Sequence, residues 1–132
     1  MRVLVDSSVW IDYFSGASST QAEALEQFVD KGEDICICGH ILSEVLRGCR
    51  HDEQFSKVER RFAVLEFLPM TEATFKQAAV MYRSLRKSGL TLKNNVDTYI
   101  AAVAIESRVH LLHNDRDFQL ISQQFPLQTI SV

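Results

Sequence analysis

The chain has 132 residues, 46% of them hydrophobic, and a net charge of −3. This length suits a single domain, residues 1–132, that buries about two-thirds of the surface its unfolded form exposes, and it leaves no room for a second domain. The longest apolar run, Tyr99 to Ile105, has seven residues, which excludes a membrane helix of about 20 apolar residues. Because Asp6 also interrupts any signal-peptide core, we expect a soluble, cytoplasmic protein with no membrane partner.

Charge and cysteine content narrow the class further. The cysteines are Cys36, Cys38 and Cys49, an odd number, so reduced thiols are expected. A negative net charge argues against a nucleic-acid partner. When the five acids discussed below are set aside, however, the chain has 14 basic and 12 acidic residues, so the rest of the protein is slightly positive. Basic residues cluster in two stretches, a pattern also typical of solvated helix faces. They are Arg47, Arg50, Lys57, Arg60 and Arg61, and then Arg83, Arg86, Lys87 and Lys93.

In chain order, short β-type runs alternate with longer helical stretches, which predicts a three-layer α/β/α fold with a five-stranded parallel sheet. The expected strands are Arg2 to Val5, Asp34 to Cys38, Glu66 to Leu68, Val109 to Leu112 and Leu127 to Ile130. The expected helices are Ser8 to Phe14, Gln21 to Asp30, Ile41 to Cys49, Glu53 to Leu65, Glu72 to Lys87, Val96 to Glu106 and Phe118 to Gln123. The helix from Glu72 has the clearest apolar stripe, made of Phe75, Ala78, Ala79, Tyr82 and Leu85.

Asp6 and Asp115 each follow an expected strand. Asp6 ends Val3 to Val5 and begins a helix, and Asp115 follows Val109 to Leu112, with Asp117 close behind. Either acid can simply cap its helix, because an Asp side chain accepts backbone N–H groups that a helix start leaves unpaired. An open parallel sheet binds its ligands at the carboxyl ends of the strands, however, so both acids also lie where chemistry is expected.

Glu44 and Asp97 lie on expected helices. Glu44 is at the margin of an apolar face that includes Ile41 and Val45. A surface pair with Arg47, three residues later, would also explain it. Asp97 opens the most apolar helix of the chain, where the helix dipole alone favours an acid by about 0.3–1 kcal/mol. Few polar residues in that helix draw Asp97 toward solvent.

If the fold gathers these carboxylates, their repulsion must be relieved. Two carboxylates about 5 Å apart repel by roughly 3 kcal/mol at an effective dielectric constant near 20, which corresponds to about two pKa units. Such a group must therefore bind protons or a cation. Oxygen ligands select Mg²⁺ or Mn²⁺ over zinc or copper, so the sequence predicts a divalent-metal site.

Four short motifs carry a resemblance to a known family. They are Val5 to Ile11, Ser43 to Gly48, Asp97 to Ala102 and Asn114 to Phe118. In order, they resemble the four acidic motifs of PIN-domain ribonucleases, most nearly the VapC-type toxins of bacterial and archaeal toxin–antitoxin pairs. The likeness extends from Arg2 almost to Val132. It implies a PIN-like fold and a metal-dependent endoribonuclease that acts as the toxin of such a pair.

The resemblance also implies residue roles and partners. The catalytic, metal-binding acids would be Asp6, Glu44, Asp97 and Asp115, with Asp117 as an auxiliary acid and Ser7 or Ser8 as a supporting hydroxyl. A small antitoxin would insert a segment near the acids, and the toxin would form a homodimer. Trp10, Tyr13 and Phe14 are candidates for an apolar groove that receives this partner, or they are core residues.

Arg47, Arg50 and Lys93 are candidates for contacts to RNA phosphates. His113 departs from the family pattern, which commonly has Thr or Ser two residues before the acid that matches Asp115. It is a candidate for a phosphate contact or for proton transfer, with a plain structural contact as the alternative. Cys36, Cys38 and His40 alternate along a strand and its exit, as a soft-metal site would, but any strand produces the same alternation.

Three other functions are weighed against this one. A receiver-like domain requires paired acids after the first strand and a late lysine, but Ser7 follows Asp6 and no lysine follows Lys93. A haloacid-dehalogenase-like phosphatase requires Asp-x-Asp, and Ser8 stands in the second position. A catalytically silent PIN-fold binding module that acts through a protein partner remains the main alternative, although the intact acid set argues against it.

Overall fold

A computed structural model covers residues 1–132. Its four strands are β1 (Arg2–Val5), β2 (Asp34–Cys38), β3 (Glu66–Leu68) and β4 (His110–Leu112). The helices are α1 (Ser7–Ser15), α2 (Thr20–Asp30), α3 (Gly39–Arg47), α4 (Asp52–Phe62), α5 (Glu72–Lys87), α6 (Val96–Ser107) and α7 (Arg116–Gln124). All seven expected helices and the first four expected strands are present, with boundaries that shift by a few residues.

The strands form one parallel sheet in the order β3-β2-β1-β4. In register, Leu4 of β1 lies beside Cys36 of β2 and Leu111 of β4. Both neighbours of β1 run parallel to it, so Asp6 and the residues after β4 emerge at the same edge of the sheet. This arrangement makes the edge at the carboxyl ends of β1, β2 and β4 the natural place for a site.

The prediction of a fifth strand from Leu127 to Ile130 is wrong. Residues 127–130 touch the sheet through a single parallel bridge between Leu111 and Thr129. Leu111 donates its N–H to Gln128 O at 2.8 Å, and Ile130 donates to Leu111 O at 3.0 Å. Pro126 directly precedes this segment and has no N–H to extend the ladder. The sheet therefore has four strands and a short bridging segment at the β4 edge.

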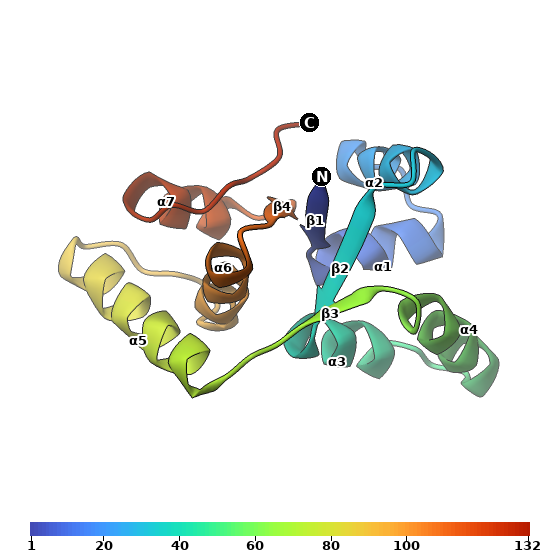
Figure 1. The fold of residues 1–132 in the computed structure, drawn as a ribbon, viewed down its shortest axis with the longest axis horizontal. Coiled ribbons are helices and arrows are strands. Elements are labelled where there is room, and N and C mark those ends of the chain that lie inside the picture. The colour runs from blue at the N-terminus through green and yellow to red at the C-terminus, as the bar shows by residue number, and fades with distance from the viewer.

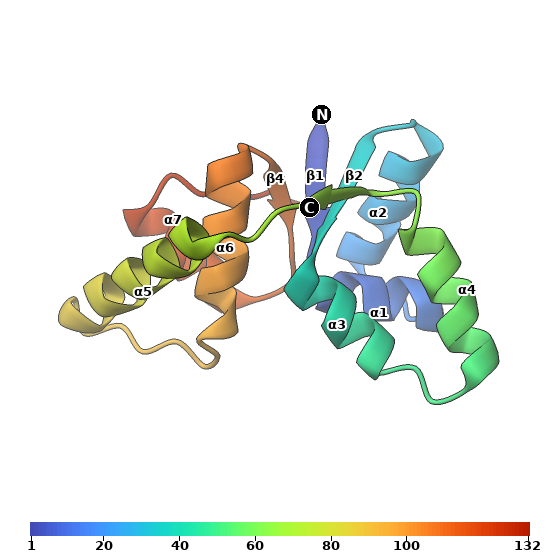
Figure 2. The ribbon, with the colours of Figure 1, turned by 60° about the horizontal axis from the view of Figure 1, so that its bottom comes forward.

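Helices cover both faces of the sheet, as the periodicity predicts. Figures 1 and 2 show α1, α2 and α4 on one side and α5, α6 and α7 on the other. Helix α3 leaves the carboxyl end of β2 and contacts α1, α4 and α6. The core is one cluster of 31 buried residues, which includes the apolar residues of β1 and residues 100–104 of α6. No helix is both long and apolar enough to span a membrane.

Helix α5 is turned relative to the predicted stripe. It buries Thr74, Ala78, Met81 and Leu85, whereas Phe75 is 43% exposed. Thr74 is buried at the helix start because its hydroxyl accepts the N–H of Thr71 at 2.9 Å, which is one half of a capping box. Packing against α6 and this cap, and not apolarity alone, determine which face of α5 is buried.

We expect Leu4→Ala to lower the free energy of unfolding by about 2–5 kcal/mol, because it removes buried methyl groups from the central strand and leaves a cavity. Leu4 is fully buried, whereas Val64 is 84% exposed. The matched control Val64→Ala should change the free energy of unfolding by less than about 0.5 kcal/mol. Urea denaturation followed by circular dichroism measures both, and equal effects would contradict this description of the core.

Candidate metal centre

The carboxyl edge of the sheet brings together acids from distant parts of the sequence. Asp6 follows β1, and its N–H donates to Leu112 O at 3.0 Å, which joins the ends of β1 and β4. Asp115 lies just beyond β4, and Glu44 lies on α3, which follows β2. Asp97 is in the first turn of α6. Short connections from parallel strands thus deliver these acids to one place.

The tightest group consists of Asp97, Asp115 and Asp117. Each offers one carboxylate oxygen such that the three atoms lie within 4.8 Å of one another. Asp97 is 6% exposed and Asp117 is 3% exposed. Asp117 accepts the backbone N–H of Lys93 at 2.8 Å, and Asp115 accepts the N–H of Asp117 at 2.9 Å. Asp117 is therefore a full member of this group and not merely its neighbour.

Asp6 and Glu44 lie beside this group and are held by serine hydroxyls. Ser8 donates its hydroxyl to Asp6 Oδ2 at 2.9 Å, and Ser7 donates to Glu44 Oε2 at 3.3 Å. Ser7 and Asp6 are both buried. Ser7 thus connects the start of α1 to α3, and Ser8 orients the neighbouring Asp6.

Burial and mutual repulsion raise the pKa values in this group. Desolvation, followed by the negative charges of Asp115 and Asp6, raises the pKa of Asp97 from its usual 3.8 to about 8. Desolvation also raises the pKa of Asp6, and the charge of Glu44 adds to this effect, although the hydroxyl of Ser8 opposes it. Carboxylates confined in this way must take up protons or a cation.

Two carboxylate oxygens among the five acids have no hydrogen-bond partner within the protein. They are Glu44 Oε1 and Asp97 Oδ2, both buried. A buried carboxylate oxygen without a hydrogen bond is destabilising, and a bound cation would satisfy it. The donors are all carboxylate oxygens, the ligand type that Mg²⁺ and Mn²⁺ prefer. The residues present therefore fit a hard divalent cation.

The structure also tests the simpler explanations for these acids. Asp6 is at the N-cap position of α1 but makes no side-chain cap hydrogen bond. Glu44 forms no ion pair with Arg47, since the three ion pairs of the protein involve other residues. Asp115 does cap α7 through the N–H of Asp117, so capping and membership of the acidic group coexist there.

His113 is buried beside Asp115. Its exposed fraction is 5%, and its ring lies against Phe118 with 5.0 Å between ring centroids. The Nδ1 atom accepts the N–H of Asp115 at 3.1 Å, while the buried Nε2 has no partner. Burial lowers the pKa of the ring below its usual 6.5. His113 thus shapes the turn that presents Asp115.

The predicted phosphate contacts, Arg47, Arg50 and Lys93, are exposed, and none of them takes part in an ion pair. The alternative soft-metal site receives no support. His40 stacks on Tyr99 with 5.1 Å between ring centroids, and burial raises the pKa of Cys36 and Cys38 to about 11, which keeps both thiols protonated.

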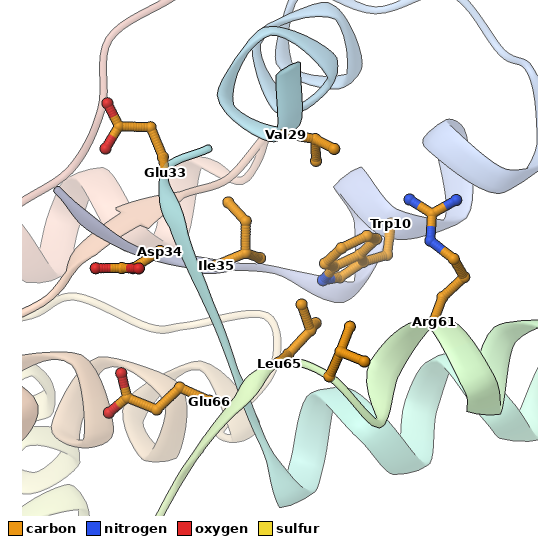
Figure 3. Close-up of a pocket in the computed structure, with 9 residues that line it drawn as sticks. Trp10, Val29, Glu33, Asp34, Ile35, Arg61, Leu65 and Glu66 are labelled. Atoms are coloured by element: carbon orange, nitrogen blue, oxygen red, sulfur yellow. The ribbon is translucent and has the colours of Figure 1, made fainter. Parts of the chain in front are cut away.

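A separate cavity of about 550 Å³ lies away from the acids, at the amino ends of β2 and β3. Figure 3 shows Trp10, Ile35 and Leu65 in its middle, Arg61 at one end and the carboxylates of Glu33, Asp34 and Glu66 at the other. Trp10 is 2% exposed, and its indole Nε1 has no hydrogen-bond partner. Sequence patterns proposed Trp10 for a groove but did not locate this cavity.

Comparison with known proteins agrees with this geometry. The family model of the PIN domain matches residues 3–123. Ribonuclease VapC11 of Mycobacterium tuberculosis is 32% identical over 131 residues, which cover 98% of both chains. Among solved structures, VapBC2 of Rickettsia felis has a TM-score of 0.76 at 22% identity over 99% of this chain and 100% of that chain. VapC20 of M. tuberculosis, described as a Sarcin-Ricin loop cleaving toxin, has a TM-score of 0.64 at 17% identity over 93% and 95% of the two chains. The four acidic motifs converge at one sheet edge, and the family model and these relatives cover nearly the whole chain. The chain therefore belongs to the PIN-domain family, alongside the VapC ribonucleases.

Proposed function

We propose that the protein is a metal-dependent endoribonuclease and the toxin of a toxin–antitoxin pair. The observation that carries this proposal is the convergence of one carboxylate oxygen each from Asp97, Asp115 and Asp117 within 4.8 Å, together with the unpartnered, buried Oδ2 of Asp97. A buried group of this kind has little structural purpose without a cation. The relationship to VapC ribonucleases at 32% identity supports RNA as the substrate.

In this proposal five acids, Asp6, Glu44, Asp97, Asp115 and Asp117, hold Mg²⁺ or Mn²⁺. Such a cation supplies a Lewis acid that activates water and stabilises negative charge on a phosphodiester. The protein residues fix the carboxylates in place. Ser7 and Ser8 orient Glu44 and Asp6 through their hydroxyls, and the backbone N–H of Lys93 orients Asp117. Apolar residues of β1 and α6 exclude water from one side of the group.

RNA phosphates would approach from the solvent side of the acids. Because the N–H of Lys93 binds Asp117, the exposed side chain of Lys93 begins next to the group. Arg47 ends α3, three residues after Glu44. Neither side chain is engaged in an ion pair. These properties support Lys93 and Arg47 as phosphate contacts, with Arg50 close in sequence to Arg47.

A cytoplasmic ribonuclease toxin needs a neutralising partner, and the cavity around Trp10 supports one. Its apolar walls and the unpartnered indole N–H suit a helical or extended segment that offers an apolar side chain and a hydrogen-bond acceptor. Trp10 is on α1, whose amino end carries Asp6. A small antitoxin bound there would contact the helix whose start carries Asp6.

The homodimer is proposed from the family likeness, and the sheet edge supports it. Strand β3 is an edge strand, and Phe67 on it is 55% exposed. Phe75, at the start of the next helix, is 43% exposed. Exposed aromatic residues on a sheet edge favour association with another chain.

The alternative of a silent binding module predicts no RNA cleavage. We expect Asp6→Asn and Asp97→Asn each to lower the rate of RNA cleavage in Mg²⁺ or Mn²⁺ by at least about 100-fold, because each removes a charge that holds the cation. The matched control is Asp12→Asn, an acid on α1 outside the group. Gel analysis of total cellular RNA with and without EDTA measures the effect. The proposed mechanism is wrong if both variants cleave as fast as the parent protein.

The pKa of Asp97 predicts how stability depends on pH. Because its folded-state pKa, about 8, exceeds the usual 3.8, the folded protein retains a proton that the unfolded chain has lost. In EDTA, stability should therefore fall as pH rises from about 4 to 8, and Mg²⁺ should restore stability most strongly at the upper end of this range. Asp97→Asn should weaken both effects. Urea denaturation at pH 5 to 9 tests this, and an unchanged pH profile in the variant would contradict it.

Expression of the chain alone should slow the growth of a bacterial host, because uncontrolled RNA cleavage is harmful. Asp97→Asn, expressed to the same level, should restore growth. Growth curves with inducible expression measure the difference, and quantification of both proteins by immunoblot serves as the control. Normal growth with the parent protein, at a level of soluble protein equal to that of the variant, would argue for the silent binding module.

A further inference from the structure

A polar pocket of about 280 Å³ adjoins the acidic group at the turn between β4 and α7. It is lined by Gln21, His113, Asn114, Asp115, Arg116, Gln119 and residues 130–132. Asp115 is its only acidic side chain and is also a member of the tightest acidic group. A ligand in this pocket would therefore lie directly beside the proposed reaction centre.

The side chains of this pocket offer hydrogen bonds more than charge. Gln21, Asn114 and Gln119 carry carboxamides, each with two donor hydrogens and an acceptor oxygen. Those of Asn114 and Gln119, like the guanidinium of Arg116, make no hydrogen bond to the protein, and that of Gln21 accepts only from Thr20. The pocket thus has hydrogen-bond donors and acceptors that the protein does not use, and one cationic side chain, Arg116.

His113, which also lines this pocket, has a ring nitrogen that makes no hydrogen bond within the protein. Since its Nδ1 accepts the N–H of Asp115, the ring hydrogen of the neutral imidazole is on Nε2. Nε2 is buried and has no hydrogen-bond partner, and the whole residue is only 5% exposed. A buried N–H without an acceptor is rare in native proteins and points to a missing ligand or water.

We propose that this pocket receives the unpaired base of the RNA nucleotide next to the scissile phosphodiester. In this arrangement the carboxamides of Gln21 and Gln119 read the edge of the base, and Arg116 contacts the neighbouring phosphate. The inference rests on the proposed ribonuclease function and adds to it a binding site for one base.

The composition of the pocket favours a base over an isolated anion or an apolar segment. Neutral carboxamides match the mixed donors and acceptors of a base edge, whereas Asp115 would repel an anion deep in the pocket. Apolar walls come only from Ile130 and Val132, too few for an apolar helix face. A base can enter only when it is unpaired and unstacked, which is how proteins usually read RNA sequence.

Binding can be tested without cleavage. In the Asp97→Asn background, fluorescence anisotropy should be measured with labelled single-stranded hexamers of A, C, G and U in Mg²⁺. We expect a preference for one base, and Gln119→Leu and Gln21→Leu should each reduce it about tenfold, as expected for loss of one amide contact. Gln123→Leu is the matched control, because Gln123 is exposed on α7 and lies outside the pocket; it should retain the preference.

Cleavage mapping separates this inference from the proposed function. With the acids intact, Gln119→Leu should alter the base found next to the cut sites in a random RNA pool, whereas Gln123→Leu, outside the pocket, should leave the cut sites unchanged. Parent-like cut sites in this variant, or equal binding of all four hexamers by the Asp97→Asn protein, would overturn the inference while cleavage stands. A parent protein that cleaves no RNA would overturn the proposed function, and the hexamer result would still decide for or against the pocket. Weaker binding of a co-purified protein with unchanged RNA binding would assign the pocket to that partner and overturn the inference.

Discussion

Repulsion among carboxylates that the fold cannot separate is the constraint on which the rest of this structure depends. Parallel strands β1 and β4 end side by side, and the N–H of Asp6 on Leu112 O joins their ends. Apolar residues on both faces of the sheet pack around these ends, and carboxylate oxygens of Asp97, Asp115 and Asp117 lie within 4.8 Å of one another. Desolvation and this repulsion raise the pKa of Asp97 to about 8. A proton or a divalent cation must therefore complete the folded protein.

The two proposed interactions lie at opposite ends of the sheet: RNA at the acidic edge and the antitoxin at the Trp10 cavity. The acids, His113 and the carboxamide pocket lie at the carboxyl ends of β1 and β4, where the substrate is proposed to bind. The Trp10 cavity lies at the amino ends of β2 and β3. Helix α1 links them, since it carries Asp6 at its start and Trp10 in its middle.

Local pattern predicted most of the fold, and long-range contacts account for the errors. The helices and four strands follow from periodicity, and the start of α5 follows from its Thr-based cap. The prediction of a fifth strand was wrong because a strand forms only where it pairs with a neighbouring segment, and residues 127–130 pair with β4 at one bridge only. The buried stripe of α5 was misplaced because Thr74 turns inward for its cap hydrogen bond while Phe75 remains exposed.

The sequence alone identified the residues that are proposed to carry the chemistry: four ordered acidic motifs, the apolar strands before Asp6 and Asp115, and the two serines after Asp6. Only the tertiary structure showed which acids lie closest together, by placing carboxylate oxygens of Asp97, Asp115 and Asp117 within 4.8 Å of one another. It also left one oxygen of Glu44 and one of Asp97 without a partner. It also revealed that Gln21 shares a pocket with Gln119. The physical reason is that motifs record local backbone geometry, whereas distances between side chains from different elements arise only from packing.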